Sequence, residues 1–161
     1  MKRFMFALCM VALTGTATLG AGIGLFGSHW DPDEADDALG AGVSVNFDTV
    51  PLELRATFYP DVSVPGAGDS LLIPIDLGLA VNLSRSESFD IYLGAGGSYG
   101  IIDADHGDPD NEFGWYALGR LEVPLQRRMN VFGTIMYRGL EFDDIGADLS
   151  GLVFNVGLIF R

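Results

Sequence analysis

Eight β-like segments of this sequence are joined by connections of two alternating kinds, long acidic stretches and tight turns. The long connections are Gly27 to Ala38, Asp61 to Ser70, Asp103 to Glu112 and Glu141 to Asp148, and the short ones are Asp48 to Pro51, Ser84 to Ser88 and Gln126 to Met129. Successive connections of an up-and-down antiparallel barrel lie at opposite ends. Strict alternation therefore predicts one elaborate end and one plain end, which is typical of a transmembrane β-barrel.

Apolar residues recur with a period of two between these connections, as expected for β-strands. In the second segment Ala41, Val43, Val45 and Phe47 alternate with glycine, serine and asparagine. Most segments are about 10 to 13 residues long, close to the length that a tilted strand needs to cross a membrane. The predicted fold class is all-β, an eight-stranded antiparallel up-and-down transmembrane β-barrel.

The first segment is predicted at Leu19 to Leu25, between glycines. Two later segments fit the pattern less well. Pro74 would remove a ladder hydrogen bond from the fourth, so that strand is expected to start at Ile75 or to carry a bulge. The seventh, Asn130 to Phe142, has apolar residues on both parities, and its lumen face is assigned only because Arg138 needs a polar environment.

A soluble lipocalin-like barrel has the same period, so the direction of each face is a separate question. A solvated exterior would be rich in Lys and Glu, whereas the less apolar face here offers mainly Gly, Ser, Asn and Tyr. The apolar face is therefore predicted to contact lipid. Aromatic residues near segment ends would form interfacial girdles: Phe47, Tyr59, Phe89, Tyr99, Trp115, Tyr137 and Phe160. The run Gly94 to Gly97 is interpreted as small residues where the interior is crowded.

The predicted lumen face carries nearly balanced charges. These are Glu53, Asp76, Asp90 and Glu122 against Arg55, Arg120 and Arg138. Opposite charges in a low-dielectric tube are expected to pair, because an unpaired buried charge is costly. An eight-stranded barrel is also just wide enough for side chains to fill, so the lumen is predicted to be plugged.

The N-terminus has the three zones of a secretory signal: Met1-Lys2-Arg3, the apolar run Phe4 to Leu13, and small residues up to Ala17. We predict a signal peptide at residues 1–17 and one barrel domain at residues 18–161; a retained N-terminal strand is the alternative. Removal of residues 1–17 would leave seven arginines and no lysine against 22 acidic residues, which argues against nucleic-acid binding. It would also remove the one cysteine, Cys9, and with it disulfide and thiol chemistry.

The last segment, Gly151 to Arg161, resembles the C-terminal strand signal of bacterial outer-membrane barrels, with Asn155, Gly157 and Phe160 at the matching positions and Arg161 where an aromatic residue is expected. The whole chain resembles the small eight-stranded outer-membrane β-barrel family of the OmpA, OmpX and OmpW type. The resemblance implies a monomer in the outer membrane of a two-membrane bacterium, with outer-membrane lipid and the assembly machinery as partners. It carries no enzyme signature.

Sixteen of the 22 acidic residues lie in the four long connections, which contain no Lys or Arg. One interpretation is a solvated rim that discourages self-association, with no cofactor. The other is a Ca²⁺ or Mg²⁺ site, because both ions prefer carboxylate oxygens. The best candidate ligands are Asp103, Asp105, Asp108, Asp110 and Glu112, although they lack the offsets of an EF-hand loop.

The two histidines, His29 and His106, are predicted to lie in the long connections as exposed residues, with transition-metal binding as the alternative. Outer-membrane lipid deacylases are similar in size and use a Ser, His and acid set on the strand surface. Ser28-His29 has no evident third member, so catalytic residues are not assigned.

The function favoured by these observations is a structural or surface-interaction role in the outer membrane. A narrow channel for small solutes or ions is the first alternative, and a soluble periplasmic carrier is the second.

Overall fold

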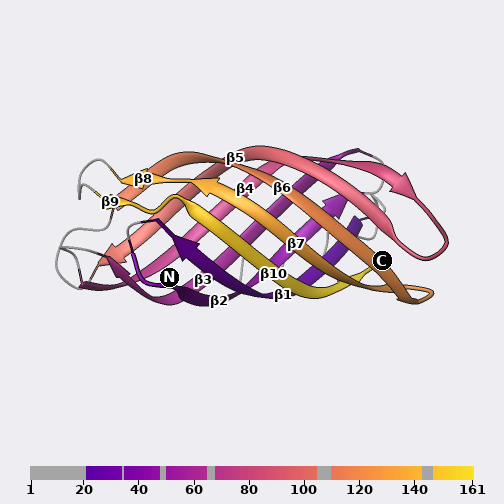
Figure 1. Ribbon diagram of the computed structural model, residues 1–161, viewed down its shortest axis with the longest axis horizontal. Helices are drawn as coiled ribbons and strands as arrows, with labels where there is room; N and C mark the ends of the chain where they lie inside the picture. Colours follow the sequence, from indigo (N-terminus) through magenta and orange to yellow (C-terminus); the bar gives the residue numbers. More distant parts are fainter. Residues whose placement is uncertain (1–20, 34, 48–49, 65–67, 105–109, 143–146) are drawn as a thin grey trace.

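The computed structural model describes residues 21–33, 35–47, 50–64, 68–104, 110–142 and 147–161. Eight antiparallel strands close into one barrel, in which β1 pairs with β10 to complete the ring (Figure 1). The barrel strands are β1 (Ala21–Pro32), β2 (Ala38–Phe47), β3 (Leu52–Val64), β4 (Gly68–Arg85), β5 (Asp90–Ala104), β6 (Asp110–Gln126), β7 (Met129–Gly139) and β10 (Gly151–Phe160). A two-stranded hairpin, β8 (Glu141–Phe142) and β9 (Ala147–Asp148), stands between β7 and β10. The predicted all-β eight-stranded barrel is confirmed.

No helix in these described ranges is long and apolar enough to cross a membrane. The predicted signal peptide, residues 1–17, lies outside the described residues.

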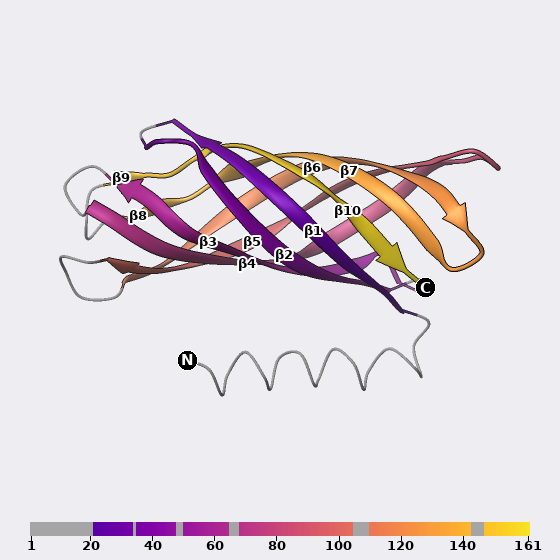
Figure 2. The same cartoon turned by 90° about the horizontal axis from the view of Figure 1, so that it is seen from below.

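The two ends of the barrel differ in their connections. We call the end that carries connections 48–51, 86–89 and 127–128 the short-turn end, and the opposite end, with connections 33–37, 65–67, 105–109 and the β8–β9 hairpin, the loop end. Figure 2 shows that the chain terminates at the same end as the β6–β7 turn. Every second connection therefore belongs to the same end, as predicted.

The predicted lengths of the long connections were wrong. β1 continues through Gly27 to Pro32, β3 continues to Val64, and β5 and β6 leave only residues 105–109 between them. β1 is described from Ala21 onward, and the predicted start of the first strand at Leu19 lies outside the described residues. Glycine and aspartate suggested loops. An aspartate on the outer face of a strand, however, needs only water to solvate its carboxylate, and the hydrogen bonds to neighbouring strands hold its backbone in place. Asp31 and Asp103 are both exposed members of strands.

The two uncertain strands are resolved by the ladder. β7 buries Phe132, Met136 and Arg138 and exposes Ile135 and Tyr137, so the assignment of Arg138 to the lumen is confirmed. β4 runs from Gly68 straight through Pro74, so the expected start at Ile75 was wrong.

The expected irregularity lies on the neighbouring strand. Pro74 is aligned with Gly100 of β5, whereas the register with β3 shifts between Tyr59 and Val62, which places the extra residue at Pro60–Asp61. β4 pairs with β5 in one register from Ser70 to Asn82, and a second register shift follows between Asn82 and Ser84.

The inward face is not polar throughout, which corrects the predicted lumen. At the loop end a large apolar cluster fills the interior. Its members include Trp30, Tyr59, Val62, Leu72, Ile102, Leu140, Phe142 and Leu149. Polar and charged side chains occupy the other part of the lumen. Tyr59 belongs to this core with 0% exposure, so its predicted place in a girdle was wrong.

Candidate functional site: the lumen and the loop end

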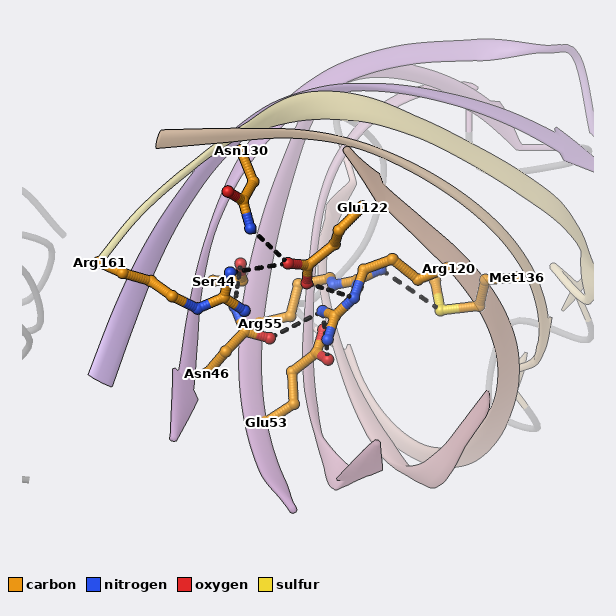
Figure 3. Close-up of polar contacts among 9 residues, drawn as sticks. All are labelled: Ser44, Asn46, Glu53, Arg55, Arg120, Glu122, Asn130, Met136 and Arg161. Atoms are coloured by element: carbon orange, nitrogen blue, oxygen red, sulfur yellow. Dashed lines mark hydrogen bonds and ion pairs between the residues drawn. The ribbon is translucent and has the colours of Figure 1, made fainter. Parts of the chain in front are cut away.

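The charged part of the lumen is organised around Arg120 of β6, which points into the barrel (Figure 3). Its Nη1 donates to Glu53 Oε2 at 2.7 Å and to Asn46 Oδ1 at 2.7 Å. Its Nε lies 3.2 Å from Glu122 Oε1. Arg55 Nη2 donates to the second oxygen of Glu53 at 2.6 Å. The predicted pairing of inward charges is confirmed for these four ionic side chains.

Arg161 adds a cation that sequence reasoning did not place in the lumen. Its Nη1 donates to Glu122 Oε2 at 2.8 Å, and Asn130 Nδ2 donates to the same oxygen at 3.1 Å. Its backbone N–H also bonds the carbonyl oxygen of Arg128 at 3.0 Å. Alternation along the strand predicts that Arg161 shares the inward face with Ile159. This alternation was the sequence signal that could have placed Arg161 in the lumen.

A second ion pair lies nearer the loop end. Arg138 Nη2 donates to Asp76 Oδ2 at 2.7 Å, and Ser98 Oγ donates to Asp76 Oδ1 at 2.7 Å. The guanidinium carbon of Arg138 is 5.6 Å from the ring centroid of Trp30. All three polar side chains are buried, so Asp76 is held as a paired carboxylate against the apolar cluster, whose members Met136 and Leu140 flank Arg138 in the chain.

Small residues make room for the side chains that cross the lumen. Gly78 and Gly96 face each other in the β4–β5 ladder, and a Cβ on Gly96 would collide with the backbone of Leu77 and Gly78. A Cβ on Gly78 would lie 2.5 Å from the Tyr116 hydroxyl. The interpretation of Gly94 and Gly96 as packing residues is therefore confirmed, whereas Gly97 has ample space.

A hollow of about 700 Å³ opens at the short-turn end. Its walls include Asn46, Asn82, Asp90, Tyr92, Arg120 and Arg161. Asp90 was predicted to face inward and is half-buried in this wall. Arg120 forms the inner limit of the hollow, with its guanidinium carbon 4.6 Å from the centroid of the Tyr92 ring.

The structure separates the predicted cation ligands. Asp103 is exposed near the end of β5, and Asp110 is the first residue of β6. Glu112 is half-buried on β6 and accepts a hydrogen bond from the N–H of Phe113 at 3.0 Å. Asp105 and Asp108 lie outside the described residues. Within the part of the chain that is described, no three His, Cys, Asp or Glu side chains lie close enough to hold a metal ion.

Asp103 instead has acidic neighbours on adjacent strands. Together with Asp61 of β3 and Asp69 of β4 it lines a hollow of about 610 Å³ at the loop end. Sequence spacing could not reveal this grouping, because Asp103 is far from Asp61 and Asp69 in the chain and the β3 bulge places Asp61. The three carboxylates share a rim without forming a closed ligand set.

His29 was predicted in a loop but lies on β1, which corrects that expectation. Its Nε2 is 3.3 Å from Asp37 Oδ2, and its ring tilts against Phe154 on the outer face. Ser28 faces the lumen, where its Oγ is 2.6 Å from the Tyr59 hydroxyl. Ser28 and His29 therefore point to opposite faces and form no nucleophile–base pair. His106 lies outside the described residues.

The outer face of the barrel is apolar and fully exposed. Leu77, Phe113 and Val156 expose 54%, 78% and 68% of their surface. So wide a band of exposed apolar side chains would be unfavourable in water. Aromatic pairs lie near the loop end, with Tyr99 and Phe113 at 4.7 Å and Trp115 and Tyr137 at 5.6 Å between ring centroids. An apolar band with aromatic residues at its edge matches the lipid-facing surface of a transmembrane barrel.

Comparison with known families agrees with this geometry. Residues 4–161 match the profile of the outer membrane protein beta-barrel domain. The chain belongs to that family. It is therefore an outer-membrane β-barrel protein. No curated protein matches it by sequence.

Two solved structures share this outer-membrane barrel fold. Neisserial surface protein A (NspA) aligns with a TM-score of 0.64 and 14% identity, over 88% of this chain and 95% of its own. Ail, the attachment invasion locus protein of Yersinia pestis, in complex with the heparin analogue sucrose octasulfate, aligns with a TM-score of 0.52 and 13% identity, over 87% and 95%. Identities this low establish the shared fold alone.

Proposed function

We propose that this outer-membrane barrel acts as a structural and surface-interaction protein, without catalytic activity, and that its loop end faces the cell exterior. The observation that carries this proposal is the division of the molecule into a filled lumen and an acidic loop end. Small outer-membrane barrels place short turns in the periplasm and longer loops outside. A surface role requires only the exposed loop end, whereas catalysis would require a nucleophile and a base on one face, and Ser28 and His29 lie on opposite faces.

The charge of the loop end favours a cationic partner. The four long connections contain sixteen acidic residues and no Lys or Arg. Ail is described with a polyanionic heparin analogue, and a rim of carboxylates would repel such a ligand. Long-range attraction would instead steer a positively charged protein or peptide toward this rim.

Whole-cell binding tests this proposal. Cells that display the barrel are expected to bind polylysine-coated beads in a salt-sensitive manner and heparin-coated beads no better than cells without it. Replacing Asp31, Asp33 and Asp37 with asparagine should weaken binding to polylysine, whereas Glu87→Gln, at the short-turn end, should not.

Protease added to intact cells should cut in connections 33–37 or 105–109 and spare 86–89. Cleavage at 86–89 alone would invert the orientation, and equal binding by the triple variant would refute the acidic docking surface.

Divalent cations are the second ligand class proposed for the loop end. Asp61, Asp69 and Asp103 line one hollow, and a divalent ion would relieve the repulsion among these carboxylates. We expect millimolar Ca²⁺ or Mg²⁺ to raise the melting temperature of the barrel, and replacing Asp103, Asp105 and Asp108 with asparagine to abolish that rise. Identical melting in chelator and in Ca²⁺ would leave the solvated rim as the better description.

A narrow channel has less support as the alternative, because the apolar cluster occupies the lumen at the loop end.

We also propose that the barrel is a monomer and that the assembly machinery recognises β10. Phe160 exposes 43% of its surface on the lipid side of this strand, where a partner can contact it.

A further inference from the structure

One row of paired lumen residues runs around the inner wall of the barrel and includes Arg120. Strand pairing aligns Tyr92 of β5 with Arg120, Arg120 with Thr134, Thr134 with Asn155, and Asn155 with Ser28. Tyr92 and Arg120 line the hollow of about 700 Å³ that opens at the short-turn end. The other members of the row are Thr134, Asn155 and Ser28, which follow Arg120 along the inner wall of the barrel.

Polar atoms in this row have no hydrogen-bond partner in the described protein. They include Thr134 Oγ1 and both polar side-chain atoms of Asn155. Thr134 and Asn155 are only 3% and 1% exposed. Leaving such groups unpaired in a protein interior is unfavourable, so native structures satisfy them with protein or with ordered water.

The charges in the lumen decide what kind of molecule can bridge these atoms. The inward acidic side chains Glu53, Asp76 and Glu122, with Asp90, are matched in number by the arginines Arg55, Arg120, Arg138 and Arg161. A small ion would upset this balance in a low-dielectric site. Water can both donate and accept, which suits an amide and a hydroxyl on adjacent strands.

The next row toward the loop end has a different character. Leu118, Met136, Val153, Trp30 and Ala38 are aligned across neighbouring strands, and all of them belong to the buried apolar cluster. Beyond them the same cluster continues through Tyr59, Leu72 and Leu140. Water that reaches Thr134 therefore meets this apolar cluster, together with the buried Arg138–Asp76 pair that it surrounds, before the loop end.

We propose that the hollow at the short-turn end is a blind aqueous vestibule, whose water extends past Arg120 to a buried hydration site between Thr134 and Asn155, and that the apolar cluster seals it from the loop end. The barrel then admits water from one side only. This inference concerns the interior and does not depend on the partner proposed for the loop end.

Accessibility of single cysteines to Ag⁺ tests this proposal in lipid vesicles, with protease digestion to report orientation. The full chain carrying Cys9→Ser supplies the background, since Cys9 is the one cysteine of the sequence. In Thr134→Cys, Ag⁺ added at the short-turn side should block later labelling of the denatured protein by a thiol dye, and Ag⁺ at the loop side should not. Ile135→Cys is the matched control at the same depth, because Ile135 faces lipid with 59% exposure; it should stay protected, as should Leu140→Cys within the seal.

Protection of Thr134→Cys equal to that of Ile135→Cys would refute the hydrated site. Blocking from both sides would refute the seal. Thr134→Val gives a second measurement that needs no probe: if water bridges the two side chains, the variant loses a bond and melts at a lower temperature. A higher melting temperature would mean that the hydroxyl was unsatisfied and the site dry, which would overturn the proposal.

Discussion

Replacing Arg120 with alanine is expected to destabilise the barrel by about 2 to 5 kcal/mol. The guanidinium contacts Glu53 at 2.7 Å and Glu122 at 3.2 Å, and both carboxylates are almost completely buried. Removing the cation strands buried charge, and this cost is larger than the net contribution of the pair itself. Arg55 and Arg161 would each retain one contact with these carboxylates, so the loss falls short of unfolding.

The free energy of unfolding in urea, measured in lipid vesicles, gives this result directly. Arg127→Ala is the matched control, because Arg127 lies in the exposed β6–β7 turn and should change stability by less than about 0.5 kcal/mol. Conductance in a planar bilayer provides the second readout, since a plugged wild-type lumen should not conduct steadily. A conducting wild-type barrel together with an Arg120→Ala variant of unchanged stability would refute the plug and favour the channel.

Replacing Arg138 with alanine should cost about 3 to 5 kcal/mol, the range for breaking a buried ion pair. Arg138 is 0% exposed and its Nη2 is 2.7 Å from Asp76 Oδ2. Asp76 would keep the hydrogen bond from Ser98 but would lose its counter-charge. Residues of the apolar cluster lie on both sides of Arg138, with Met136 before it and Leu140 after it, so little water can reach the stranded carboxylate.

The double variant Asp76→Leu, Arg138→Met separates the charge from the packing. Apolar side chains of similar volume remove both charges together, and such replacements are commonly neutral or stabilising. We therefore expect urea denaturation to show near wild-type stability for the double variant and a marked loss for Arg138→Ala. Equal losses in the two variants would contradict this account, because they would mean that the shape of the Arg138 side chain matters more than its charge.

Much of the barrel follows from local sequence alone. The period of two assigns each side chain to one face, since successive residues of a strand point in opposite directions. It placed Glu53, Arg55 and Arg120 in the lumen before any partner was known, whereas Arg138 was assigned to the lumen because its charge needs a polar environment. The same parity brings Arg161 inward, although the expectation of an aromatic residue at that position obscured it.

The limits of the strands were harder to predict than their faces. Asp31 and Asp103 suggested loops because acidic residues are rare in ordinary strands, yet both continue a ladder beyond the apolar band. A strand that extends from lipid into water can change composition without ending, because its hydrogen bonds come from neighbouring strands.

The sequence by itself therefore determined the all-β class, the eight strands, the direction of their faces and the inward charges. Only the tertiary structure decided which charges meet, that an apolar cluster seals the loop end, and that Asp103 shares a rim with Asp61 and Asp69. The physical reason is that the direction of a side chain depends on its own strand, whereas its partners depend on closure of the barrel and on the register of strands far apart in the chain.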